Sequence, residues 1–168
     1  MNAVIKEKIA RGESLTKDEL EKVLVNGGRL KDVFKLSDRD LTTLAIVGYE
    51  LFNQGKFDDA RVVFQGLNAL GHEDSFVQTA LGTLAARDGE LDKAIDYFNK
   101  ALIRDPEDLT ALTNRAEVYL KKNCFDQAAT DLKMAIDLDP NEESPMSSRA
   151  RVLAMVTREL MESIKTPA

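Results

Sequence analysis

Side chains that could carry out catalysis or bind a metal are sparse in this sequence. The single histidine, His72, follows Gly71 in a predicted turn, where a solvated ring is more common than a metal ligand or a general base. The single cysteine, Cys124, has no histidine near it in the sequence that could activate its thiol as a nucleophile. Because neither residue has the neighbours that nucleophilic or acid–base catalysis needs, we expect a protein that is not an enzyme.

Acidic residues cluster around position 140, a pattern that could suggest calcium binding. The cluster consists of Asp137, Asp139, Glu142 and Glu143. It lacks the ligand spacing and the central glycine of an EF-hand loop. Its carboxylates fit better at the solvated end of one helix and the start of the next, where negative charge is favourable. The sequence also lacks a phosphate-binding loop of the G-x-x-x-x-G-K type, so we expect no metal and no cofactor.

Small and aromatic residues recur at intervals of 34 positions through the middle of the chain. A recurrence of this length indicates a repeat protein in which each unit is one helical hairpin. The recurring sets are Gly48, Gly82 and Ala116; Gly55, Gly89 and Asn123; Phe57, Leu91 and Phe125; Ala60, Ala94 and Ala128; Phe64, Phe98 and Leu132; Leu67, Ala101 and Ala135; and Pro106 with Pro140. Seven sets in one register make coincidence a poor explanation.

The recurring residue types have structural reasons. Small residues such as Gly48 and Gly82 allow the two helices of a hairpin to approach closely, while aromatic and leucine side chains fill the space between hairpins. Gly55 and Gly89 can adopt the left-handed backbone conformation that ends a helix. The recurring prolines stop the second helix, because proline cannot continue the hydrogen-bond ladder. No segment alternates at period two over the length of a strand, so we predict an all-α fold.

This pattern resembles the tetratricopeptide repeat (TPR). Leu81-Gly82 supplies the L-G pair of that family, Tyr119 its tyrosine, and Ala94 with Phe98 its A-x-x-x-F element. The resemblance implies a TPR solenoid of three helix-turn-helix repeats with N-terminal helices and a C-terminal capping helix. We place the N-terminal helices at 1–40, the repeats at 41–74, 75–108 and 109–142, and the capping helix with its tail at 143–168.

Helix signals flank the repeats on both sides. Thr16 and Glu19 form a predicted capping box that opens a segment ending at Gly27-Gly28, and Ser37 is a predicted N-cap of the first repeat helix. Ser144-Pro145 predicts the start of the terminal helix. Apolar residues of the terminal helix follow a helical stripe that we expect to cover the last repeat: Met146, Val152, Leu153, Val156, Leu160 and Ile164.

Stacked TPR hairpins form a concave groove lined by the first helix of each repeat, where the family places its ligand-facing side chains. The matching positions of this sequence give a candidate peptide-binding set: Ala45, Tyr49, Phe52, Phe76, Thr79, Thr83, Arg87, Thr113, Glu117, Leu120 and Lys121. Its small side chains leave pockets, its aromatic rings offer apolar walls, and its cations can fix polar groups. Alternatively, Tyr49 and Phe52 pack against the N-terminal helices.

TPR adaptors of heat-shock chaperones bind a C-terminal carboxylate through a set of Lys, Asn and Arg side chains. The matching positions here are Ala45, Tyr49, Ala80, Thr110 and Asn114. These residues do not reproduce the cluster of donors and cations that a carboxylate requires. The sequence therefore argues against a heat-shock co-chaperone.

The segment 49–67, YELFNQGKFDDARVVFQGL, resembles the first TPR of class II type III secretion chaperones. Those are small cytoplasmic proteins that guard hydrophobic translocator subunits. The resemblance implies a chaperone that holds an extended hydrophobic segment of a translocator-like client against Ala45, Tyr49 and Phe52. It also implies that the N-terminal region can form a homodimer. The alternative is a general TPR scaffold or adaptor that mediates protein–protein interaction.

Charge and hydropathy exclude other classes of partner. The 168-residue chain has a formal net charge of −6 and a pI near 4.9, which argues against phosphate-contacting nucleic-acid binders. No run approaches the roughly 20 apolar residues of a membrane span, and the N-terminus lacks the apolar core of a secretory signal. We therefore expect a cytoplasmic protein with a protein or peptide client, without nucleic acid and without stable membrane insertion.

Overall fold

The computed structural model describes residues 36–72 and 74–165, together with five positions before residue 17. The helices predicted before residue 36, including the capping box at Glu19 and the break at Gly27-Gly28, lie outside the described residues. The chain forms two compact units, Met1–Glu73 and Asp74–Ala168.

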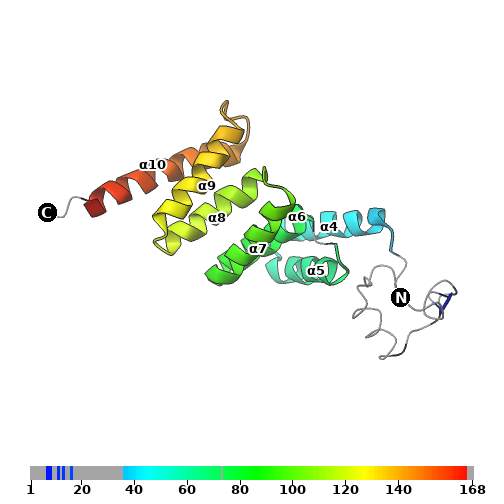
Figure 1. Ribbon diagram of the computed structural model, residues 1–168. Helices are drawn as coiled ribbons and strands as arrows, with labels where there is room; N and C mark the ends of the chain where they lie inside the picture. Colours follow the sequence, from blue (N-terminus) through cyan, green and yellow to red (C-terminus); the bar gives the residue numbers. More distant parts are fainter. Residues whose placement is uncertain are drawn as a thin grey trace. The chain divides into compact units, whose positions relative to one another are not determined.

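Every element of regular structure in the described part of the chain is an α-helix (Figure 1). The first unit contains α4 (Asp38–Asn53) and α5 (Phe57–Ala69). The second unit contains α6 (Ser75–Arg87), α7 (Leu91–Arg104), α8 (Leu109–Lys121), α9 (Phe125–Leu138) and α10 (Pro145–Lys165). The predicted all-α fold is confirmed.

Helix α4 begins at the predicted cap. The Ser37 hydroxyl accepts a hydrogen bond from the Asp40 backbone N–H at 3.2 Å, and the Asp40 carboxylate accepts one from the Ser37 backbone N–H at 2.9 Å. This reciprocal pair satisfies two donors and confirms Ser37 as the N-cap. Hydrogen bonds from the Ser37 hydroxyl and from its backbone N–H lower the pKa of Asp40.

Glycine sets the distance between the two helices of the first unit. A Cβ atom added at Gly48 of α4 would lie 2.9 Å from the ring of Phe64 in α5, closer than carbon atoms can pack. Phe64 is fully buried, so its ring cannot turn away into solvent. Gly55, in the turn between the helices, has a φ of +74°, a conformation that glycine adopts without strain.

The second unit repeats this arrangement in α6 and α7. A Cβ atom added at Gly82 would lie 2.7 Å from the ring of Phe98, which is also fully buried. The turns after α6 and α8 place Gly89 at a φ of +79° and Asn123 at +58°. Asparagine is among the few other residues that tolerate this region. The recurrence of Gly55, Gly89 and Asn123 in the sequence thus reflects one recurring backbone conformation.

Aspartates and prolines mark the ends of helices in the second unit. Asp74 and Asp108 each accept a hydrogen bond from the backbone N–H three residues further on, at 2.8 and 2.9 Å. These bonds cap α6 and α8. Helices α7 and α9 end two residues before Pro106 and Pro140, respectively, as expected for a residue that cannot continue a helix.

A largely buried ion pair joins three helices of the second unit. Arg115 of α8 donates two hydrogen bonds to the carboxylate of Asp131 in α9, both 2.7 Å long, and one to Asn99 of α7 at 2.6 Å. Burial acts against the charge of the guanidinium, but the hydrogen bond and the attraction from Asp131 outweigh it and raise the pKa of Arg115. The bidentate geometry fixes the relative position of the helices.

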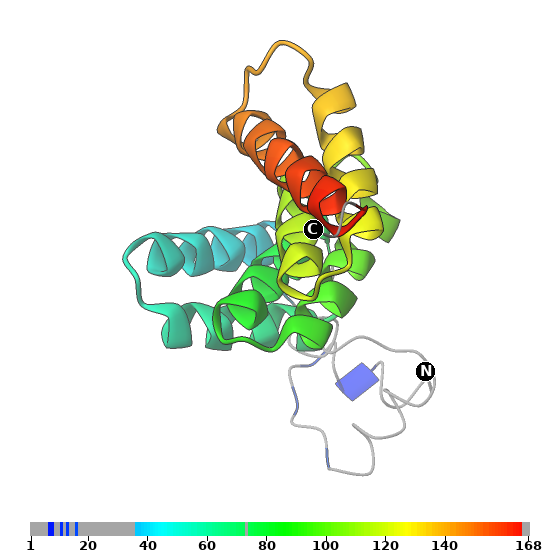
Figure 2. The ribbon, with the colours of Figure 1, turned by 90° about the vertical axis from the view of Figure 1, so that its left-hand side faces the viewer.

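Helix α10 covers α8 and α9, as predicted for a capping helix (Figure 1, Figure 2). Ser147 and Ala150 are fully buried. Leu153 and Ala154 pack against the core cluster that contains Leu132 of α9. Small side chains on this face allow the helix axes to approach closely.

The predicted apolar stripe of α10 is only partly right. Met146 and Leu153 are half-buried, whereas four other members are exposed: Val152, Val156, Leu160 and Ile164. The face in contact with the rest of the unit carries smaller side chains, Ser147, Ala150 and Ala154, and this contact turns the larger residues outward.

Candidate peptide-binding surface

The candidate residues of the first unit lie on α4 with unequal exposure. Tyr49 is 50% exposed, whereas Ala45 is buried. Phe52 is half-buried, and its ring meets the ring of Phe57 edge-to-face with 5.3 Å between centroids. Tyr49 therefore presents part of its ring to solvent, while Phe52 also contributes to packing within the unit.

Three further apolar side chains of α4 are exposed and were not among the predicted site residues: Leu44, Ile46 and Val47. The buried row of this helix consists of Leu41, Ala45 and Gly48. Apolar residues that fall outside such a row face solvent or a partner. Ile46 lies three residues before Tyr49 and so on the same side of the helix, whereas Leu44 and Val47 lie on the other side of the buried row.

In the second unit, α6 exposes Phe76 and buries Thr79. Phe76 is 43% exposed and Thr79 only 7%. The Thr79 hydroxyl donates a hydrogen bond to the carboxylate of Asp108 at 2.7 Å, and Ser75 donates to the same carboxylate at 2.6 Å. Thr79 thus ties α6 to the N-cap of α8, and Phe76 is the apolar side chain that α6 offers to a ligand.

Thr83 and Arg87 follow along α6. The Thr83 hydroxyl donates to the Thr79 carbonyl at 2.8 Å and accepts from the side-chain amide of Asn114 at 3.1 Å. Arg87 is exposed, 3.4 Å from the carboxylate of Asp88. Exposed ion pairs of this kind contribute little energy, so the guanidinium can exchange this carboxylate for another acceptor.

Helix α8 carries the remaining four predicted residues. Thr113 is fully buried, and its hydroxyl donates to the Met146 carbonyl at 3.5 Å. Leu120 is half-buried and packs against the core of the unit. The Lys121 ammonium lies 3.1 Å from the carboxylate of Glu117. This helix therefore offers the candidate surface a charged pair and part of one leucine.

Arg149 of α10, which is not among the predicted site residues, also contacts α8. Its guanidinium donates to the side-chain oxygen of Asn114 at 3.1 Å and pairs with the carboxylate of Glu117. A signal for this contact exists in the sequence, because buried Ala150 lies 34 residues after Ala116. Treating α10 as the first helix of a further repeat would have placed it beside α8.

Asp139 fixes the start of α10. Its carboxylate accepts hydrogen bonds from the Ser147 hydroxyl at 2.7 Å and from the backbone N–H groups of Ser144 and Glu143 at 2.8 and 3.0 Å. These bonds, that from Ser147 foremost, lower the pKa of Asp139, and the charge of Arg151 acts in the same direction. The same bonds orient the helix that carries Arg149.

The chemistry available on these helices is that of polypeptide binding. Within the described residues, no three side chains of His, Cys, Asp or Glu gather in a way that could hold a metal ion. None of the helices in this part of the chain combines the length and the apolar character needed to cross a bilayer. What the helices offer are exposed aromatic and aliphatic groups on α4 and α6, and hydrogen-bonded polar groups on α6 and α8.

The chain matches known proteins over most of its length. Family models described as tetratricopeptide repeat match residues 42–74 and 79–143, which confirms the predicted TPR resemblance. The low calcium response locus protein H of Yersinia pestis is 30% identical over 132 residues, which cover 77% of this chain and 79% of that protein.

Solved structures of one chaperone are similar in fold. The Yersinia enterocolitica type III secretion chaperone SycD, in complex with a peptide of the translocator YopD, is 26% identical with a TM-score of 0.67, covering 74% of this chain and 97% of that chain. An alternative dimer of SycD is also 26% identical, with a TM-score of 0.68 over 75% of this chain and 97% of that chain.

Proposed function

Because the chain belongs to the tetratricopeptide-repeat family of type III secretion translocator chaperones, we propose that it holds an extended hydrophobic segment of a secreted, translocator-like client protein. Binding covers that segment and so prevents aggregation and premature assembly of the client. The observation that carries the proposal is the apolar face of α4, on which Tyr49 and Ile46 are about half exposed.

In this proposal the apolar face of α4 supplies most of the favourable free energy of client binding. An extended strand directs alternate side chains to one side, so a client segment can set several apolar groups against one helix face. Fully burying a large apolar side chain contributes about 1.5–3 kcal/mol. Tyr49 and Ile46, three residues apart on one side of α4, provide the area for such burial.

The predicted residues of α6 and α8 divide into supports and contacts. We assign Thr79 and Thr113 to support, since both are buried and hydrogen bonded within the unit. The other positions are accessible enough to meet a client: Phe76, Thr83, Arg87, Glu117, Leu120 and Lys121. In this division Arg87, Glu117 and Lys121 bind polar groups of the client. Phe76 and Leu120 bind its apolar side chains.

The proposal extends to the organisation of the chain. It places the repeats at 41–74, 75–108 and 109–142, the N-terminal region at 1–40 and the capping helix with its tail at 143–168. The chain acts by holding its client and not by converting a substrate. It does so in the cytoplasm, where a translocator must be kept from membranes before export.

Co-expression with an aggregation-prone translocator subunit encoded in the same genome tests this function. The wild-type chain should raise the soluble yield of the client, and Tyr49→Asp should abolish that gain by placing a charge on the apolar face. Val62→Asp is the matched control, because Val62 is an exposed apolar residue of α5 in the same unit. Tyr49 is a cleaner target than Phe52, which packs against Phe57.

Circular dichroism should show the same helical content in both variants, so that a lost gain in yield reports on binding alone. A wild-type chain that leaves the client insoluble would favour the general scaffold or adaptor. If Tyr49→Asp and Val62→Asp give equal yields, the client does not bind at α4.

A further inference from the structure

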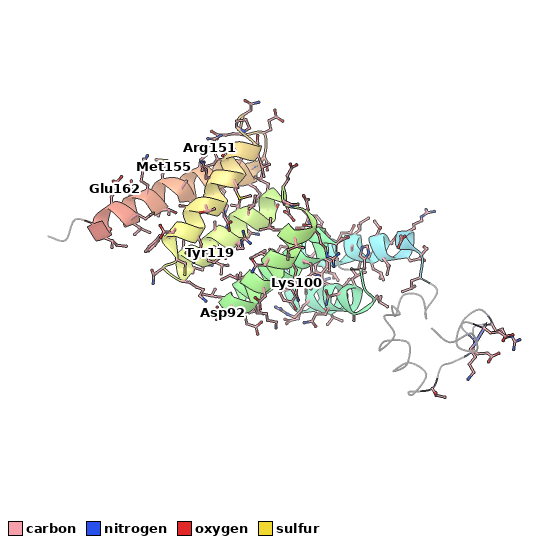
Figure 3. The ribbon with its side chains drawn as sticks, viewed as in Figure 1. Asp92, Lys100, Tyr119, Arg151, Met155 and Glu162 are labelled. Atoms are coloured by element: carbon pink, nitrogen blue, oxygen red, sulfur yellow. The ribbon has the colours of Figure 1, made fainter. Side chains whose placement is uncertain are left out.

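Large apolar side chains are exposed along α10, with charged residues such as Arg158, Glu159 and Glu162 exposed between them. The apolar ones are Val152 at 61%, Met155 at 57%, Val156 at 43%, Leu160 at 40% and Ile164 at 63%. Figure 3 labels Met155 and Glu162 on the part of α10 that extends toward the C-terminus. Terminal helices of repeat arrays normally present a polar outer face, because an exposed apolar one lowers solubility. Exposed apolar side chains gathered in this way mark an interaction surface.

The equivalent repeat position is covered in the earlier helices. Val152 lies 34 residues after Val118, and Val118 lies 34 residues after Leu84. Val118 and Leu84 are 1% and 0% exposed, and Val118 packs in a core cluster with Phe98 of α7. A position that is buried among helices in α6 and α8 is thus open in α10. The geometry points to another helix as the group that covers it.

We propose that α10 pairs in antiparallel orientation with α10 of a second copy of this chain. Four exposed apolar residues are spaced by four and form one ridge along the helix: Val152, Val156, Leu160 and Ile164. The ridge is symmetric about position 158. A two-fold rotation places Val152 against Ile164 of the second copy and Val156 against Leu160 of the second copy.

The exposure of the ridge has the same symmetry. Its two outer residues, Val152 and Ile164, are 61% and 63% exposed, and its two inner residues, Val156 and Leu160, are 43% and 40% exposed. A two-fold interface uses the same surface on both subunits, so it requires a patch that complements its own reversed copy. The ridge of α10 meets this requirement in spacing and in exposure.

The size and charge of the ridge make the pair reversible. The segment 152–164 is about 20 Å long, and its few apolar side chains cover less than the roughly 800 Å² per partner of a standard interface. Glu159 borders the ridge near its centre and is exposed, so the two-fold rotation brings its carboxylate toward the one of the second copy. Like charges oppose pairing. We therefore expect a pair that forms as the protein concentration rises.

Cysteine crosslinking of the full chain tests the register. In a Cys124→Ser background, Val152→Cys and Ile164→Cys chains should form a disulfide-linked dimer when mixed, because the two positions face each other. Either chain alone should not, since residue 152 lies about 18 Å along the axis from residue 152 of the second copy, beyond the reach of a disulfide. Cys124→Ser removes the native thiol, which would otherwise add its own crosslinks.

Two substitutions should shift the association in opposite directions. Leu160→Asp should abolish the crosslink. In sedimentation velocity it should raise the fraction of the smaller species at each protein concentration. Glu159→Gln should increase the crosslinked fraction by removing the repulsion. Ile103→Asp is the matched control, because Ile103 is an exposed apolar residue of α7 in the same unit and should leave the crosslink unchanged.

Several outcomes would overturn the inference. A Val152→Cys chain that crosslinks to itself would mean parallel pairing, and no crosslink in the mixture would mean that α10 does not meet a second copy. Protection of α10 from hydrogen exchange only after client is added would make the client its occupant. The inference is independent of the proposed function, since Leu160→Asp should leave the soluble yield of the client unchanged.

Discussion

The candidate surfaces of α4 and of α6 with α8 differ in how their side chains are held. On α4, Tyr49 and Ile46 present apolar groups to solvent. On α6, the hydroxyls of Thr79 and Thr83 are engaged in hydrogen bonds with groups of α8. The first surface gains energy by burying apolar area, whereas the second offers fixed polar groups. The first helices of the repeats therefore supply apolar area for burial in the first unit and fixed hydrogen-bonding groups in the second.

We expect the two units to unfold separately. Phe64→Ala in the first unit and Phe98→Ala in the second each remove a fully buried ring, and each should lower the free energy of unfolding of its unit by about 3–5 kcal/mol. Amide hydrogen exchange should then lose protection in α4 and α5 for Phe64→Ala, and in α6 to α10 for Phe98→Ala. Equal loss throughout the chain in either variant would mean that the units unfold as one.

The framework of the second unit should depend on its largely buried ion pair. Asp131→Ala leaves the Arg115 guanidinium without its carboxylate and should lower the free energy of unfolding by about 3 kcal/mol. Asp137→Ala, an exposed change on the same helix, should stay within about 0.5 kcal/mol of wild type. Urea denaturation followed by circular dichroism measures both. Coincident transitions for the two variants would mean that the ion pair does not stabilise the second unit.

The helix contacts in the two units should respond alike to added volume. Gly82→Ala and Gly48→Ala should each lower stability by about 1–3 kcal/mol, because the added methyl group meets a buried ring at 2.7 and 2.9 Å, respectively. Gly66→Ala in α5, with nothing within 4 Å of the added atom, should instead raise stability by about 0.5–1 kcal/mol. Thermal melting ranks the three variants. A stabilised Gly82→Ala chain would mean that the hairpin tolerates wider helix spacing.

Acid should weaken the start of α10 through Asp139. Its folded-state pKa is lowered, so the stabilisation is present above the unfolded value of about 3.9 and is lost as the pH falls through the lower folded-state pKa. Asp139→Asn should therefore melt at a lower temperature than wild type at neutral pH, with the difference narrowing below about pH 4. A difference that stays constant down to pH 2 would assign the effect to something other than this carboxylate.

The hairpin architecture could be predicted because its determinants lie within single repeats. Gly48 with Phe64 and Gly82 with Phe98 are contacts between residues 16 positions apart, and the 34-residue recurrence encodes both. The helix caps follow the same logic. Ser37 acts on backbone groups within three residues, so its role can be inferred from local sequence.

The packing of α10 could not be predicted in the same way. Apolar periodicity identifies the faces of a helix, but it does not decide between them when both carry apolar residues. On α10, Ala150 and Ala154 pack against the unit while Val152 and Val156 face outward. The contact of Arg149 with Glu117 joins residues 32 positions apart and depends on which of these faces packs.

The central claim is that a client segment lies on α4, and crosslinking at one residue tests it most directly. A photo-reactive phenylalanine analogue placed at position 49 in the chaperone–client complex should crosslink to the client on illumination. The same analogue at position 62 on α5 should not. Crosslinks from position 62 with none from position 49 would contradict the claim and place the client on another surface.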